Sequence, residues 1–219
     1  MTTSMTATPR TIVHLMRHGE VHNPAKILYG RLPDYHLSDL GRQMADRVAE
    51  SLEGHDVALV VASPLERAQE TARPVAEHFR TPILTDSRLI EAGNHFEGRR
   101  FGHGAGSLRR PANWWLVRNP LTPSWGEHYR AIARRMEAAV DAARQHAPGR
   151  EVVLVSHQLP VWTLRRHLEG RPLWHDPRRR QCSLASLTSL HYDGERLTSI
   201  VYSEPAGALL QVAEPTVGA

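Results

Sequence analysis

Short apolar runs alternate along this chain with segments whose apolar residues recur at helical spacing. Four runs, at residues 12–16, 57–62, 82–85 and 151–155, have the length and composition of buried strands. Between and after them, helices are predicted from the N-cap Ser38 to about residue 54, and over residues 65–79, 127–146 and 160–168. Residues 183–192 and 196–203, joined by Asp193-Gly194, are typical of a β-hairpin.

This alternation predicts the α/β class. We expect a three-layer sandwich, with a mostly parallel central sheet, helices on both faces and the terminal hairpin as an antiparallel edge. One domain is expected over residues 11–204, between flexible tails at 1–10 and 205–219. The irregular stretch 92–126 interrupts the pattern with glycines, prolines and tryptophans. We interpret it as an insertion packed over the strand ends, where an active site is expected.

Composition narrows the class of protein. With 219 residues, 41% of them hydrophobic, the chain suits one domain with a substantial core. Cys182 is the only cysteine, which excludes an internal disulfide and argues against a thiolate metal site. No apolar run approaches membrane-spanning length and the first residues do not resemble a signal peptide, so we expect a cytoplasmic protein that does not bind membranes.

The charge favours anionic partners, at +4 with an isoelectric point near 9.7. Nucleic acid is one class of anion, and the run Arg178-Arg179-Arg180 is its best candidate contact. We interpret that run instead as a solvated surface cluster and expect no nucleic-acid partner.

Cationic and imidazole side chains follow three of the predicted strands. Arg17 and His18 follow the first, Arg67 lies just past the second, and His157 follows the fourth. In a parallel sheet these ends share one edge, so the four side chains are expected to form a cationic pocket. Arginine presents forked donors that match phosphate oxygens, and a neutral imidazole beside them can attack phosphorus.

The motif Arg17-His18-Gly19-Glu20 after a strand resembles the signature of the histidine phosphatase superfamily, which includes the cofactor-dependent phosphoglycerate mutases. The similarity continues, in the family's order, through Asn23, residues 37–41, 63–71, Glu91 with residues 96–98, Gly126-Glu127 and residues 155–157. These blocks span residues 11 to about 168.

The resemblance implies a role for each matching residue. His18 is expected to be the phospho-accepting nucleophile, oriented through its other ring nitrogen by a backbone carbonyl. Arg17, Arg67 and His157 are expected to bind phosphoryl oxygens, with a polar contact from Asn23. Glu91 matches the general acid. The family requires no metal, and we expect no cofactor.

Two departures from the family pattern stand out. Residues 92–95, Ala-Gly-Asn-His, differ from the sequence that usually follows the general acid in this family, which leaves Glu97 as an alternative to Glu91. Val21 replaces the usual small hydroxyl residue after the signature.

The predicted activity is hydrolysis of a small phosphorylated metabolite through a phosphohistidine on His18. The alternatives are a cofactor-dependent phosphoglycerate mutase and a non-catalytic module that binds an anion or nucleic acid. We favour the phosphatase over the mutase because the chain is shorter than the mutases and its middle segment does not reproduce their pattern. The sequence determines neither the substrate nor the oligomeric state, and a homodimer remains open.

Overall fold

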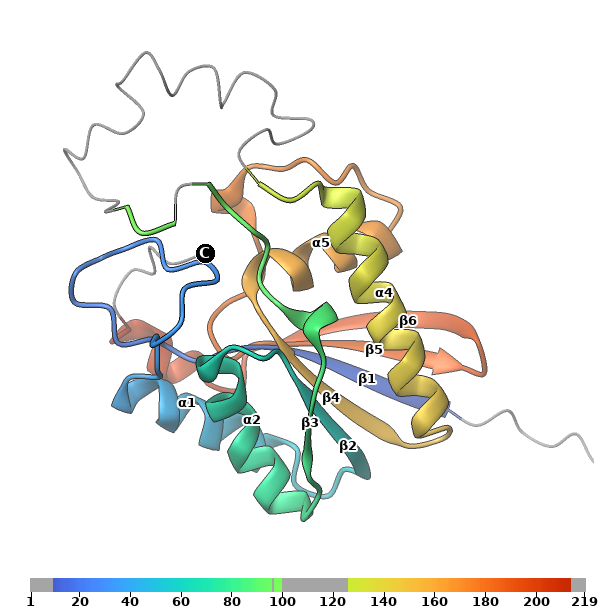
Figure 1. The fold of residues 1–219 in the computed structure, drawn as a ribbon. Helices are drawn as coiled ribbons and strands as arrows, with labels where there is room; N and C mark the ends of the chain where they lie inside the picture. The colour runs from blue at the N-terminus through green and yellow to red at the C-terminus, as the bar shows by residue number, and fades with distance from the viewer. Residues whose placement is uncertain (1–9, 96, 100–125, 214–219) are drawn as a thin grey trace, which may run out of the picture.

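A six-stranded sheet forms the centre of the molecule in the computed structural model, which describes residues 10–95, 97–99 and 126–213 (Figure 1). The strand order is β3-β2-β4-β1-β5-β6. The first four strands in this order are parallel, and β5 and β6 are antiparallel to their neighbours. The strands are β1 (Arg10–Arg17), β2 (Val57–Ala62), β3 (Ile83–Thr85), β4 (Glu151–Ser156), β5 (Leu187–Asp193) and β6 (Arg196–Ser203).

Helices cover both faces of this sheet, which confirms the predicted three layers. Figure 1 shows α1 and α2 on one face and α4 and α5 on the other. Their bounds are Asp39–Ser51, Glu66–Phe79, Tyr129–His146 and Gln158–Leu168, and short 3-10 helices η1, η2 and η3 cover Ser87–Leu89, Pro177–Arg179 and Gly207–Gln211. No helix in the described ranges combines the length and apolar character needed to cross a membrane.

Helix α1 illustrates why the sequence pattern was informative. The Ser38 hydroxyl accepts a hydrogen bond from the Gly41 amide at 2.9 Å and caps the helix, as predicted. Met44 and Val48, one turn apart, are fully buried against the sheet. The predicted stripe therefore faces the core.

The structure differs from the prediction after residue 182. The hairpin is present, and Gly194 turns it with a φ of 60°. However, β5 begins only at Leu187, because residues 183–186 form a turn in which the Ser186 amide bonds to the Ser183 carbonyl.

The segment after β6 also differs from the flexible tail that we expected from residue 205. Ala206 is 2% exposed, and Leu209 and Leu210 of η3 pack against the α1 and α2 side of the core. Burial of these apolar side chains holds residues 205–213 on the domain. Several predicted segments lie outside the described residues: residues 1–9 of the N-terminal tail, 214–219 of the C-terminal tail, and 96 and 100–125 of the expected insertion, which include Trp114, Trp115 and Trp125.

Candidate active site

The carboxyl ends of β1, β4 and β2 lie level with one another. Arg17 pairs with Ser156, and Ala62 pairs with Val155, so all three strands end in one row. The next residue of each strand extends the ladder, since the His18 amide bonds to the Ser156 carbonyl at 3.1 Å. The side chains that follow these strands therefore meet, as the parallel arrangement predicted.

His18 is fully buried and its ring has a defined orientation. Its Nδ1 lies 2.7 Å from the Gly19 carbonyl oxygen, which can only accept, so Nδ1 carries the proton. The lone pair is then on Nε2, and Nε2 has no hydrogen-bond partner among the described residues. This is the tautomer that a nitrogen nucleophile requires.

The surroundings keep this imidazole neutral. Burial lowers the pKa of His18 well below its ordinary value, and the positive charges of Arg67 and Arg17 lower it further, against the opposing hydrogen bond to Gly19. A dianionic phosphate at the site would act in the opposite direction. The free site therefore holds an imidazole whose lone pair is available at neutral pH.

His157 lies beside His18, with ring centroids 5.2 Å apart. Its Nε2 is 2.8 Å from the Ser63 hydroxyl, while its buried Nδ1 has no partner among the described residues. Burial, followed by the charge of Arg67, lowers its pKa well below the ordinary value as well. His157 is also the N-cap of α5, so the positive end of that helix dipole lies at the site.

Arg17 and Arg67 supply buried positive charge. One nitrogen of each guanidinium donates to a carbonyl oxygen, Arg17 Nη1 to Cys182 at 2.7 Å and Arg67 Nη2 to Gly30 at 2.5 Å. The other two nitrogens of each group are buried without a partner in the described part of the chain. Burial lowers the pKa of Arg67, because desolvation disfavours an uncompensated cation. Four free donors of this kind suit an anion with several oxygens and repel a metal cation.

Glu91 lies at the same site, 3% exposed. Its Oε1 accepts from the Ala92 amide at 2.8 Å, and its Oε2 is buried without a partner in the described ranges. Burial raises the pKa of this carboxyl, although the Ala92 amide and the charge of Arg67 oppose the shift. Glu97, the alternative from the sequence, accepts from the Asn94 amide in a half-buried turn. Of the two carboxyls, Glu91 is therefore the one that is buried and has a raised pKa.

Asn23 has a different arrangement from the expected polar contact with phosphate. Its amide nitrogen donates to the Ile27 carbonyl at 2.8 Å, and its amide oxygen accepts from the Ile27 amide at 3.0 Å. Both ends of the side chain are used to close a turn in the loop after β1. Asn23 therefore shapes the wall of the site in this conformation.

Gly19 has a role that the motif alone does not reveal. A Cβ at this position would lie 2.5 Å from the Gly41 carbonyl oxygen, so two backbones pass in close contact here. The loop is further tied by the Gly19 amide, which donates to the Thr71 hydroxyl, and by the Ser38 hydroxyl, which donates to the Glu20 carboxylate. The segment beside His18 is thus anchored to α1 and α2.

Two residues that the sequence analysis did not select also border the site. Tyr29 is 2% exposed, lies 6.4 Å from the His18 ring between centroids, and has the Arg67 guanidinium over its face at 4.7 Å. The apolar pair Leu28-Tyr29 within a polar loop was the available signal. Arg180 is half-buried, and its charge lowers the pKa of Glu91. It lies in the run that we interpreted as a surface cluster, and only the fold separates it from exposed Arg178 and Arg179.

We expect the buried histidines to remain neutral at a pH where an exposed histidine is charged. His36 is the matched control, because the hydrogen bond from its Nδ1 to Glu70 raises its pKa. In ¹⁵N-NMR of the ring nitrogens, His36 should be protonated first as the pH falls from 8, with His18 still neutral at pH 6. Protonation of His18 before His36 would contradict the arrangement described above.

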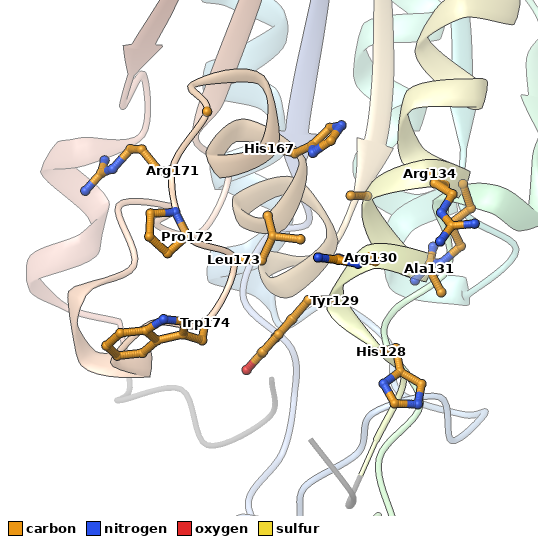
Figure 2. Close-up of a pocket in the computed structure, with 13 residues that line it drawn as sticks. His128, Tyr129, Arg130, Ala131, Arg134, His167, Arg171, Pro172, Leu173 and Trp174 are labelled. Carbon is orange, nitrogen blue, oxygen red and sulfur yellow. The ribbon is translucent and has the colours of Figure 1, made fainter. Parts of the chain in front are cut away.

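A cavity of about 1540 Å³ lies between the start of α4 and the loop after α5 (Figure 2). Its lining is rich in cationic and aromatic side chains: His128, Tyr129, Arg130, Arg134, Arg135, His167, Arg171 and Trp174. Arg135 connects it to the site, because it pairs with Glu127 at 2.9 Å, and Glu127 pairs with Arg31, whose Nε donates to the Glu91 carbonyl at 2.6 Å. A chain of ion pairs and hydrogen bonds therefore runs from one residue of the cavity lining to the backbone of Glu91.

Known proteins show the same fold and sequence pattern. The chain is 61% identical over 196 residues to the "Uncharacterized protein Rv0525" of Mycobacterium tuberculosis (strain ATCC 25618 / H37Rv), covering 90% of this chain and 97% of that protein. It is 31% identical over 184 residues to the "Probable phosphoglycerate mutase GpmB" of Yersinia pestis (strain Pestoides F), with coverage of 79% and 82%. The native structure of mycobacterial glucosyl-3-phosphoglycerate phosphatase Rv2419c superposes with a TM-score of 0.69 at 28% identity, over 89% of this chain and 96% of that chain.

The family comparison agrees with these similarities and with the geometry around His18. The model of the histidine phosphatase superfamily (branch 1) matches residues 13–204, which include every candidate site residue discussed above. The expectation from the motifs is confirmed, and the chain belongs to the histidine phosphatase superfamily.

Proposed function

We propose that this protein hydrolyses a small phosphomonoester through a phosphohistidine intermediate on Nε2 of His18, without a catalytic metal. The orientation of the His18 ring carries this proposal. Nδ1 is held by the Gly19 carbonyl, and Nε2 lies in a buried pocket with arginine nitrogens; neither Nε2 nor these nitrogens have a partner among the residues that the structure describes. These arginines supply the positive charge that a metal ion supplies in other phosphoryl-transfer sites.

In the first step the Nε2 lone pair attacks phosphorus and the bond to the ester oxygen breaks. Glu91 transfers its proton to the departing oxygen, so the leaving group departs as an alcohol. Arg17 and Arg67 donate to the phosphoryl oxygens as their charge grows, and His157 adds a donor on the other side. Glu91 is suited to this role because burial raises its pKa.

In the second step water attacks the phosphohistidine. Glu91, now a carboxylate, accepts a proton from the water as the new P–O bond forms. The N–P bond breaks and its electrons return to Nε2 of His18. Release of phosphate restores the neutral imidazole and the protonated Glu91.

The charge of the cavity between α4 and the loop after α5 supports a leaving group that is itself negatively charged. Arg130, Arg134 and Arg171 line the cavity, and all three side chains are exposed. An anionic substituent on the leaving group would be attracted to them. We therefore expect higher kcat/KM for esters with a carboxylate on the leaving group than for neutral esters of similar size, measured by phosphate release at low and high salt. Equal kcat/KM values for carboxylated and neutral esters would show that the cavity does not bind the leaving group.

A phosphoglycerate mutase is the second candidate, favoured by the 31% identity to the protein named a probable phosphoglycerate mutase. The two activities share the phosphohistidine and differ in the acceptor of the phosphoryl group. The deciding assay uses 3-phosphoglycerate with and without 2,3-bisphosphoglycerate and follows both phosphate and 2-phosphoglycerate. We expect phosphate release to dominate in both conditions. Faster, cofactor-dependent formation of 2-phosphoglycerate would establish the mutase.

Replacing Glu91 with glutamine should slow cleavage according to the basicity of the leaving group. Glutamine keeps the shape but has no proton to transfer, so kcat for alkyl phosphates is expected to fall about 10²- to 10⁴-fold. The loss should be much smaller for p-nitrophenyl phosphate, whose leaving group departs without protonation. Glu97→Gln is the matched control and should show neither effect. Equal losses on both substrates would indicate that Glu91 does not act as the acid.

A further inference from the structure

A cluster of ligand-type side chains lies at the end of the sheet opposite His18. His14 of β1, Glu151 at the start of β4 and His55 in the turn before β2 converge there. His14 precedes His18 by four strand residues, which places it about 13 Å away along β1. The proposed phosphatase chemistry uses none of these side chains.

The three side chains present their donor atoms to one point. His14 Nε2 lies 2.8 Å and His55 Nδ1 lies 2.7 Å from the same oxygen, Oε2 of Glu151. One ligand atom from each residue lies within 4.8 Å of the others. A group bound between them would be reached from the His55 side, because the His55 side chain is 40% exposed while that of His14 is 5% exposed.

The buried member of the cluster is held from behind. His14 pairs with Ser189 across β1 and β5, and its Nδ1 lies 2.8 Å from the Ser189 hydroxyl. Imidazole ligands of metals characteristically make such a bond through the second ring nitrogen, which fixes the ring and its tautomer. The same bond leaves His14 Nε2 directed at Glu151 and His55.

We propose that His14, His55 and Glu151 form a zinc-binding site. Two imidazole nitrogens and one carboxylate oxygen are a ligand set that zinc accepts, with water in a fourth, tetrahedral position. Ligand atoms of a tetrahedral zinc ion lie about 3.3 Å apart when the metal–ligand bonds are about 2.0 Å. The separations of the two imidazole nitrogens from Glu151 Oε2, 2.8 and 2.7 Å, are about half an ångström shorter, and a shift of the exposed His55 side chain would open them.

Binding requires a change of tautomer at His14, and the structure provides for it. In the metal-free cluster the proton on His14 Nε2 points to Glu151. When zinc binds Nε2, this proton moves to Nδ1, where the Ser189 hydroxyl accepts it. His55 likewise binds through Nδ1 and carries its proton on Nε2, which faces solvent. The imidazoles stay neutral and the carboxylate supplies the one negative charge of the ligand set.

The ion would connect three segments that are distant in sequence: β1, β4 and the turn between α1 and β2. A ligand that binds only the folded chain stabilises it against unfolding. Because the site is remote from His18, the ion is expected to affect stability and not turnover.

The test uses the full-length, tag-free protein after treatment with EDTA and dialysis. Zn²⁺ titrated by calorimetry should bind with one equivalent and raise Tm, and Mg²⁺, which prefers oxygen ligands, should do neither. Co²⁺ in place of Zn²⁺ should give the intense visible absorption of a tetrahedral site. Phosphatase turnover at a temperature well below Tm should be the same with and without zinc.

Variants assign the binding to this cluster. His55→Gln should abolish the Tm shift and the cobalt spectrum, and it is well tolerated by an exposed turn. Ser189→Ala should weaken zinc affinity about 10- to 100-fold, as loss of a ligand's orienting partner does. The exposed His78→Gln is the matched control and should bind as the wild type does, as should His18→Ala.

The proposal is overturned if the wild-type protein shows no tetrahedral cobalt spectrum, or if His55→Gln binds zinc with unchanged affinity. Binding that is lost in His18→Ala and retained in His55→Gln would place the ion in the phosphate pocket instead. These outcomes are independent of whether the protein is a phosphatase.

Discussion

A His18→Ala variant is expected to lose phosphomonoesterase turnover by about 10⁴- to 10⁶-fold, the range seen when a covalent nucleophile is removed. Alanine has no nitrogen to attack phosphorus, and the remaining groups can only bind the substrate. The measurement is phosphate release by purified wild-type and variant proteins at matched concentrations. Circular dichroism and Tm should show that the variant is folded, because the substitution leaves the backbone pairing of β1, β4 and β2 in place.

The intermediate can be trapped directly in the wild type. A ³²P-labelled substrate quenched during turnover should leave label on the protein that is labile to acid and stable to base, as a phosphohistidine is. The His18→Ala variant should carry none. His22→Ala is the matched control, since His22 is an exposed histidine only four residues away, and it should retain both label and turnover. Labelling that persists in His18→Ala would refute the proposed nucleophile.

An Arg67→Met variant is expected to lose about 10³- to 10⁵-fold in kcat/KM, the effect of removing an arginine from a transferring phosphoryl group. Methionine preserves much of the side-chain volume but removes the guanidinium, and with it two buried donors that have no partner in the described part of the chain. The expected loss is large because these donors act in a pocket that excludes water, where each hydrogen bond to a charged oxygen is strong.

The same variant should separate function from stability. Burial disfavours the charge of Arg67, as the lowered pKa shows, so removing the charge offsets the loss of its contacts with Gly30 and Tyr29. Tm without ligand should therefore stay within a few degrees of the wild type, while the rise in Tm on adding phosphate or vanadate should disappear. Arg73→Met, on an exposed face of the same helix, is the control and should keep the ligand response. A large drop in Tm for Arg67→Met would assign Arg67 a structural role.

The two variants test different parts of one arrangement. In the proposed mechanism His18 supplies the electron pair and Arg67 the positive charge, and both side chains are fully buried. Buried donors without partners cost free energy in the folded protein. Their presence at one end of the sheet is the expected mark of a site that is completed by an anion.

Much of this arrangement was predictable from local sequence. The hydrophobic periods of a strand and of a helix, 2 and 3.6 residues, can be recognised within a short stretch of sequence. For this reason the predicted ends of the strand before His18 and of the helix that carries Arg67 lie within about two residues of the observed ends. The motifs then selected five residues that the structure places together at the strand ends: His18, Arg17, Arg67, His157 and Glu91.

Three features that the sequence analysis did not anticipate share a physical cause. Arg180 is half-buried unlike its exposed neighbours, residues 205–213 are packed on the domain, and the Asn23 side chain closes a turn. In each case the outcome depends on a partner far away in the chain or on the closure of a loop: Glu91 for Arg180, the α1 and α2 core for Leu209, and the turn to Ile27 for Asn23. Local periodicity contains no information about such partners.

The sequence by itself determined the fold class, through local periodicity, and indicated the family, through motifs that resemble those of the histidine phosphatase superfamily. The tertiary structure decided which nitrogen of His18 is free, that Tyr29 and Arg180 border the site, and that His14, His55 and Glu151 meet at the far end of the sheet. His14 and Glu151 are separated by 137 residues in the chain, yet their side chains lie 2.8 Å apart. The reason is that β1 pairs with β4, which is distant in the chain, and this pairing is stabilised by burial of apolar side chains over the whole sheet.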